Sequence, residues 1–199
     1  ALAELIAGSE EAFAQMMNRE AHQLGMKDSH FVNSTGWPDP QHYTTAYDLA
    51  LLASAVIHDF PEYHPLYSMK EYRYNNITQA NRNRLLWSDP TVDGMKTGYT
   101  ENAGYCLITS AKRGDRRLIS VVLGTASESA RAAESQKLSG QSGRVFAGFM
   151  DLHYILAQGV IRFCLRRSFG RQVHFSQCQF AVTVNGLEGV IKIVGDAAG

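Results

Sequence analysis

Lys96-Thr97-Gly98 combines a cation, a hydroxyl and a residue without a side chain, just ahead of a strong hairpin pattern. A Lys ammonium and a Thr hydroxyl offer a carboxylate charge-assisted hydrogen bonds. Alternate strand side chains share a face, so Lys96 and Gly98 are expected on one side and Thr97 on the other. Because Gly98 lets another backbone lie close, the segment predicts a sheet edge that holds the acidic end of an extended peptide. The tripeptide alone more often marks a surface lysine beside a turn glycine.

Strands and helices around this segment would position it. Residues 104–111 and 116–123 are rich in β-formers and are joined by Lys-Arg-Gly-Asp, which predicts an antiparallel hairpin. Ser9 is a good N-cap for a helix that reaches about residue 24. Thr45 and Asp48 form a capping-box pattern for a second helix, and residues 129–138 predict a third. The expected class is α+β, with helices packed on a mostly antiparallel sheet.

Composition excludes several classes of protein. The chain has 199 residues and a formal net charge of zero, which gives no support to nucleic-acid or anionic-membrane binding. No apolar run is long enough to cross a membrane, and residues 1–20 do not read as a signal peptide. Three cysteines, at 106, 164 and 178, have no metal or redox spacing.

The composition changes near Leu138. Residues 1–138 hold 16 acids and 13 bases, whereas residues 139–199 hold 3 acids and 6 bases. Residues 139–143 have linker composition, and Asn185-Gly186 predicts a turn between two short strands within 180–194. A local basic cluster carries no nucleic-acid motif: Arg162, Arg166, Arg167 and Arg171. We therefore predict a domain over 1–138 and a tail of unknown character over 139–199.

Six segments of the first part carry a family resemblance. They are Gly-Met-Lys-Asp-Ser-His-Phe-Val-Asn-Ser-Thr-Gly at 25–36, Tyr-Thr-Thr-Ala-Tyr-Asp-Leu-Ala at 43–50, Asn-Arg-Asn-Arg-Leu-Leu at 81–86, the Lys-Thr-Gly segment at 92–100, Ala-Gly-Tyr at 103–105 and Arg-Ala-Ala-Glu-Ser at 131–135. This region resembles the low-molecular-mass penicillin-binding proteins, which are serine-type D-alanyl-D-alanine carboxypeptidases. The resemblance implies a partial penicillin-binding/β-lactamase-like transpeptidase fold.

The resemblance also implies roles for particular residues. Lys96 and Thr97 would bind the terminal carboxylate of a peptidoglycan stem peptide, or the matching carboxylate of a β-lactam. Gly98 would let the substrate pair with the strand, and the Tyr99 backbone N–H would donate to the oxyanion. Arg131 would add positive potential near the carboxylate, or would instead form an ion pair with Glu134 at the start of its helix.

The family's nucleophile and proton-transfer motifs are absent. No serine begins Ser-x-x-Lys or Ser-x-Asn, and in Ser68-Met69-Lys70 the lysine comes one residue too early. No catalytic residue is therefore assigned. We expect the chain to be an N-terminally truncated fragment whose tail does not match the family's β-rich domain, and to be inactive as it stands.

Three functional readings stay open. The first is a fragment of a serine carboxypeptidase that removes the terminal D-Ala from stem peptides ending in D-Ala-D-Ala. The second is a non-catalytic domain that binds peptides or penicillins, and the third is a β-lactamase relative. The resemblance implies β-lactams as ligands, no metal or organic cofactor, no nucleic acid and the bacterial periplasm. It is also compatible with membrane association of the intact protein, through an anchor that this sequence does not contain.

Overall fold

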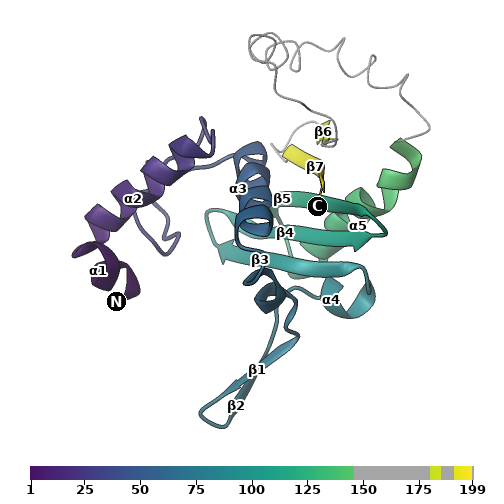
Figure 1. Cartoon of the computed structure of the whole chain (residues 1–199), viewed down its shortest axis with the longest axis horizontal. Coiled ribbons are helices and arrows are strands. Elements are labelled where there is room, and N and C mark those ends of the chain that lie inside the picture. Colours follow the sequence, from purple (N-terminus) through teal and green to yellow (C-terminus); the bar gives the residue numbers. More distant parts are fainter. Residues whose placement is uncertain (146–179, 185–190, 199) are drawn as a thin grey trace.

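The computed structural model describes residues 1–145, 180–184 and 191–198, which form an α+β fold around one antiparallel sheet (Figure 1). Five strands lie in the order β3-β4-β5-β7-β6. Their bounds are Val92–Thr100 for β3, Gly104–Arg113 for β4, Arg116–Thr125 for β5, Phe180–Val184 for β6 and Ile191–Ala198 for β7. The hairpin expected at 104–123 is therefore confirmed as β4 and β5, and β3 forms one edge of the sheet.

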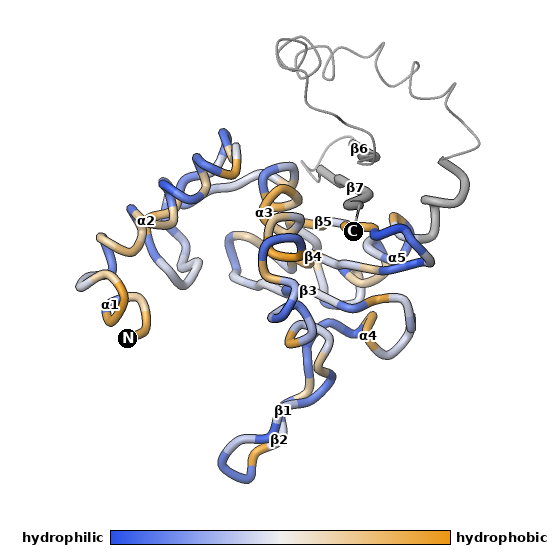
Figure 2. The backbone as a smooth tube through the Cα atoms, viewed as in Figure 1, coloured by the Kyte–Doolittle hydropathy of each residue, from blue (hydrophilic) through white to orange (hydrophobic). Residues whose placement is uncertain are grey.

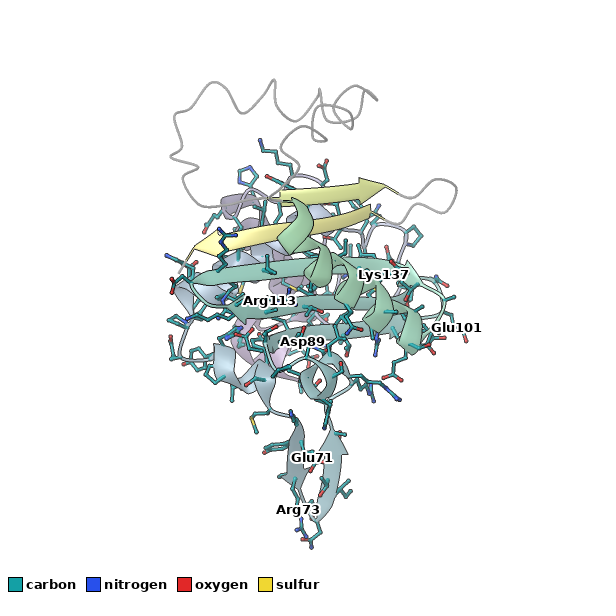
Figure 3. All side chains as sticks on the ribbon, turned by 90° about the vertical axis from the view of Figure 1, so that its right-hand side faces the viewer. Glu71, Arg73, Asp89, Glu101, Arg113 and Lys137 are labelled. Carbon is teal, nitrogen blue, oxygen red and sulfur yellow. The ribbon has the colours of Figure 1, made fainter. Side chains whose placement is uncertain are left out.

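Helices cover both faces of this sheet. On one face, α3 (Ala46–Asp59) packs its alanines at 46, 50 and 53 against a cluster that includes Met95 and Val121. On the other face, α4 (Leu85–Ser88) and α5 (Glu128–Val145) pack against β3, β4 and β5. Figure 3 shows α5 lying across the strands. Apolar clusters therefore join the sheet to helices on both sides, and this packing supports the edge strand.

The first two helices form an arm that extends away from the sheet (Figure 1). They are α1 (Leu2–Ala7) and α2 (Glu10–Gln23), and the Ser9 hydroxyl accepts from the Ala12 N–H at 3.1 Å as the expected N-cap. The periodicity of α2 predicts a buried apolar stripe, but within this helix only Ala14 and Ala21 are buried, and Met16 is 40% exposed. Because α2 packs mainly on α1, its larger apolar residues are covered only in part. In Figure 2 the apolar part of α1 lies at the far end of this arm.

The long loop at 28–43 is held by buried carboxylate contacts. Thr45 caps α3 as expected, because its hydroxyl accepts from the Asp48 N–H at 3.1 Å. The Asp48 carboxylate, however, accepts from the Asp28 N–H at 2.9 Å and from the Ser29 hydroxyl at 2.7 Å. The expected capping box is therefore formed only in its Thr45 half. The Asp48 carboxylate instead fixes the start of the loop to α3.

A two-stranded hairpin projects beyond the side of the sheet where β3 lies, away from β6 and β7 (Figures 1 and 3). It consists of β1 (Glu71–Tyr74) and β2 (Ile77–Ala80), and all eight residues are exposed. The sequence predicts one strand over 67–74, but the first part of this range lies in the 3₁₀ helix η1 (His64–Ser68).

The C-terminal part differs from expectation in one respect. Residues 139–143 have linker composition but lie inside α5, which passes Leu138 without a break. The two strands expected within 180–194 are confirmed as β6 and β7, and β7 pairs with β5. The turn at Asn185-Gly186, the segment from 146 to 179, Cys164, Cys178 and the basic cluster at 162–171 lie outside the described residues.

The helices of the described residues are all too short or too polar to span a membrane.

Candidate functional site

Lys96, Thr97 and Gly98 lie on the edge strand, as the sequence predicts. In the register, Lys96 faces Ile108, which packs toward α3, and Thr97 faces Leu107, which packs toward α4 and α5. Neighbouring side chains of β3 therefore alternate between the two faces of the sheet. Gly98 faces Cys106, and an added Cβ at Gly98 would lie 3.9 Å from the Cys106 Cβ, which is ordinary contact. The glycine is therefore not required by crowding within the sheet. Because Gly98 is exposed and has no side chain, another backbone can approach this part of β3 from solvent.

The Lys96 side chain is exposed overall, but its ammonium is partly surrounded by protein and donates to the Thr97 carbonyl. Burial lowers the pKa of Lys96, and the positive charges of Arg82 and Arg131 lower it further. Both causes disfavour the protonated form, so an anion bound beside Lys96 would relieve them. The electrostatics of this position therefore favour a negatively charged ligand.

Arg131 is the most buried cation at this edge, with 4% of its surface exposed. From α5 its guanidinium donates to the Gly98 carbonyl at 3.2 Å and to the Arg82 carbonyl at 3.4 Å. Its ion pair is with Glu128 at 3.5 Å, whereas Glu134 pairs with Lys137 at 3.1 Å. The ion pair expected with Glu134 is therefore formed with Glu128 instead. The Arg131 charge also lies close enough to Lys96 to lower the lysine pKa.

Two tyrosines extend the same part of the sheet. The rings of Tyr99 and Tyr105 lie 4.2 Å apart between centroids, and the Arg131 guanidinium carbon is 5.5 Å from the Tyr105 ring centroid. The Tyr105 ring therefore makes a cation–π contact with the Arg131 guanidinium, which stabilises the cation. Tyr99 itself is 55% exposed, so the residue is accessible from solvent.

Arg82 is not among the site residues predicted from the sequence, although it lies in the Asn-Arg-Asn-Arg motif at 81–84. The structure places its charge close enough to Lys96 to affect the lysine pKa. The flanking side chains also act here: Asn83 donates to the Gly94 carbonyl at 3.0 Å, and Asn81 donates to the Met69 carbonyl at 3.0 Å. The sequence signal that could have identified Arg82 as a site residue is its position between two asparagines in a turn-like stretch.

Positive charge exceeds negative charge at this edge. Glu128 is shared by Arg131 and by Arg84, whose guanidinium lies 3.2 Å from it. Within the described part of the chain, Lys96 and Arg82 have no carboxylate within ion-pair distance, and the Thr97 hydroxyl has no hydrogen-bond partner. Neither side chain of the Lys-Thr pair would therefore have to give up a carboxylate partner to donate to a ligand anion at the open edge of the strand. In the same described residues, no three metal-ligating side chains come together.

Residues 1–127 match the family model described as D-alanyl-D-alanine carboxypeptidase. The D-alanyl-D-alanine carboxypeptidase DacC of Escherichia coli is 50% identical over 139 residues, which are 69% of this chain and 35% of that protein.

Two solved structures are similar in fold. Penicillin binding protein 5 from Haemophilus influenzae superposes with a TM-score of 0.68 at 43% identity, covering 72% of this chain and 42% of that one. Penicillin-Binding Protein D2 from Listeria monocytogenes, in its ampicillin-bound form, gives a TM-score of 0.61 at 35% identity, covering 64% of this chain and 54% of that one. The expected penicillin-binding fold, helices on an antiparallel sheet, is thus confirmed.

The chain spans about a third of the length of DacC and 40% of a second relative, DacD of Escherichia coli. The matched residues include the Lys-Thr-Gly strand, the motif around Arg82 and the loop that Asp48 holds. This chain belongs to the D-alanyl-D-alanine carboxypeptidase family.

Proposed function

We propose that this chain supplies the carboxylate-binding strand of a serine D-Ala-D-Ala carboxypeptidase, whose substrate is a peptidoglycan stem peptide. The observation that carries the proposal is the unneutralised positive charge of Lys96 and Arg82 beside the exposed edge of β3. Lys96 and Thr97 hold the terminal carboxylate of the peptide. Arg131 adds positive potential from the buried side.

The edge of β3 also suits the main chain of an extended peptide. Gly98 is exposed and presents no side chain to an approaching backbone. Its carbonyl already accepts from Arg131, so the peptide would pair with neighbouring backbone groups of the strand. In the complete reaction the Tyr99 N–H donates to the oxyanion that forms when a serine oxygen attacks the peptide carbonyl.

The covalent steps need a nucleophile that this sequence does not carry in the family's pattern. In an acyl-enzyme route a serine oxygen displaces D-Ala, and water then hydrolyses the ester. The sequence has no Ser-x-x-Lys and no Ser-x-Asn. We therefore assign this chain to carboxylate binding and assign the bond-breaking step to a segment with these motifs.

The same observation favours a second candidate function, reversible binding without catalysis. A β-lactam carries a carboxylate that resembles the end of the peptide, and the relative from Listeria monocytogenes was solved with ampicillin bound. Binding of a β-lactam to Lys96 and Thr97 would then be non-covalent. A site of either kind belongs in the bacterial periplasm, and it requires no metal, organic cofactor or nucleic acid.

Two measurements test the proposal. Calorimetry with a peptide ending in D-Ala-D-Ala, and with the same peptide carrying a C-terminal amide, isolates the contribution of the carboxylate. We expect binding of the acid to exceed that of the amide by about ten- to a hundredfold, the value of one charge-assisted hydrogen bond. Equal affinities would reject the carboxylate site. Incubation with a fluorescent penicillin is expected to leave no label after denaturation, and a surviving covalent band would reject the assignment of this chain to binding alone.

A further inference from the structure

The segment Asn81-Arg82-Asn83 is tied to β3 at two points that lie on either side of Lys96. The Asn83 side-chain amide donates to the Gly94 carbonyl at 3.0 Å, two residues before Lys96. The Arg131 guanidinium joins the Gly98 carbonyl, two residues after Lys96, to the Arg82 carbonyl. The segment is thus connected to β3 on both sides of Lys96, once through the Asn83 side chain and once through the Arg82 carbonyl.

Asn83 is suited to this position by both ends of its amide. Its oxygen accepts from the Leu85 N–H at 3.2 Å at the start of α4, while its nitrogen donates to Gly94. Its own N–H donates to the Asn81 side chain at 2.9 Å. Only 1% of the residue is exposed, so each of these groups would be costly to leave without a partner. The amide offers an acceptor and a donor on separate atoms, and neither an ionised Asp nor Leu can replace both bonds.

Asn81 ties the other end of the segment to a different part of the chain. Asn81 donates to the Met69 carbonyl at 3.0 Å and to the Tyr67 carbonyl at 3.4 Å, which fixes the segment to the end of η1. Asn81 and Asn83 therefore hold the backbone on both sides of Arg82, while the Arg82 side chain makes no ion pair within the described part of the chain. The main chain at Arg82 is therefore held in place by hydrogen bonds, while its guanidinium stays available to an anionic ligand.

We propose that Asn83 is a positioning residue that fixes the separation between Arg82 and Lys96, and that this separation selects a carboxylate as the group bound at the edge of β3. The proposal rests on the proposed function, because it assigns the means by which that site is kept in register. Without the Gly94 connection, the segment that carries Arg82 would be joined to β3 near Lys96 by Arg131 alone. The two positive charges would then no longer converge on one anion.

Two substitutions at Asn83 separate the connection from its side effects. Asn83→Ser keeps an oxygen that can accept from the Leu85 N–H but is too short to reach the Gly94 carbonyl. Asn83→Asp keeps the length and the acceptor, loses the donor and adds a negative charge. A change seen in both variants therefore comes from the lost connection, whereas a change seen only in Asn83→Asp comes from the added charge.

The control is Arg113→Gln, which removes bonds to the Asp89 carboxylate at 3.1 Å and to the Ser139 carbonyl at 2.6 Å. Arg113 ends β4, five residues from Ile108, the partner of Lys96, and thus about 17 Å along the strand at ~3.4 Å per residue. It destabilises the same sheet without touching the site. All variants are compared by calorimetry with the acid and amide peptides, after correction for the fraction folded by circular dichroism.

We expect both Asn83 variants to lose about five- to tenfold of their affinity for the acid peptide, the value of one hydrogen bond, and none of their affinity for the amide. Arg113→Gln should keep the acid-over-amide ratio of the unaltered chain. If that ratio is unchanged in both Asn83 variants, or falls only in Asn83→Asp, the positioning role is rejected while the proposed function stands. If the unaltered chain itself shows no preference for the acid, the proposed function falls, and this proposal falls with it.

Discussion

At the scale of single residues, the site is defined by where positive charge lies and where negative charge is missing. Lys96 is exposed on an edge strand, Arg131 is buried behind it, and Glu128 is divided between Arg131 and Arg84. A lysine in ordinary solvent would make a weak anion site. Lys96 is partly buried and lies near two other positive charges, which together lower its pKa. An anion bound there therefore interacts more favourably with the lysine than it would with a lysine surrounded by water.

The pH dependence of binding follows from this lowered pKa. A carboxylate binds the protonated lysine, so affinity for the acid peptide is present below the pKa of Lys96 and is lost as the pH rises through it. The loss begins at a lower pH than for an unperturbed lysine because the pKa is lowered. Calorimetry from pH 7 to 11 should show the decline in the unaltered chain. Lys96→Arg, whose guanidinium stays charged, should bind with little change over the same range; an identical decline in both would contradict the assignment to Lys96.

Arg131 provides a second test at this scale. Lys keeps the charge but cannot donate to the Gly98 and Arg82 carbonyls together, and it cannot reproduce the contact with Tyr105. We expect Arg131→Lys to lower the free energy of unfolding by about 1–3 kcal/mol, the cost of a buried group left without its partner. Urea denaturation measures the change. A stability equal to that of the unaltered chain would show that only the charge at 131 matters.

At the scale of elements, side chains with two hydrogen-bonding functions join segments that are distant in the sequence. Asn83 joins α4 to β3, and Asp48 joins α3 to the loop at 28–29. Asp48 is 1% exposed, and its carboxylate accepts from the Asp28 N–H and the Ser29 hydroxyl. These contacts decide how the loops lie, because the loops have few apolar residues of their own.

Removing the Asp48 carboxylate should therefore release the loop and leave α3 in place. We expect Asp48→Ala to lower the free energy of unfolding by about 1–3 kcal/mol, because the loop loses both of its hydrogen bonds to this buried carboxylate. Amide hydrogen exchange at Asp28 should become faster, while exchange in the middle of α3 should follow only the global change. Thr45→Ala is the matched control: it removes the cap of the same helix and should cost ~1 kcal/mol. Equal exchange at Asp28 in both variants would contradict this role of Asp48.

At the scale of the whole molecule, the sheet joins the first 145 residues to the last strands. β7 pairs with β5 through residues 116–121, so that β5 lies inside the sheet and not at its edge. The same strand carries Ile119, Val121 and Val122, which are buried in the core on both faces. The division at residue 138 stays a proposal about domain organisation, and it falls within α5.

Truncation after Val145 tests the contribution of β7. The shortened chain would expose the backbone edge of β5, which is apolar and therefore prone to pairing with other chains. We expect a lower urea midpoint and a larger share of aggregates in size-exclusion chromatography than for the full chain. A truncated chain that is equally stable and monomeric would show that the sheet does not depend on β7.

The sequence by itself determined the elements whose signals are local. Ser9 and Thr45 cap their helices as predicted, because capping depends on one hydroxyl and an N–H three residues away. The β4–β5 hairpin and the edge position of the Lys-Thr-Gly strand follow from patterns of the same short range. The residues proposed to contact the carboxylate, Lys96 and Thr97, were identified in this way.

Only the tertiary structure decided how these residues are surrounded. The proximity of Arg82 and Arg131 to Lys96 depends on contacts between residues 11 to 49 positions apart, set by where α5 and the 81–83 segment pack on β3. Burial of α2 was overestimated for the same reason, since periodicity shows which face is apolar but not what will cover it. Local spacing fixes the direction of a side chain, whereas its pKa and partners depend on chain segments that only folding brings together.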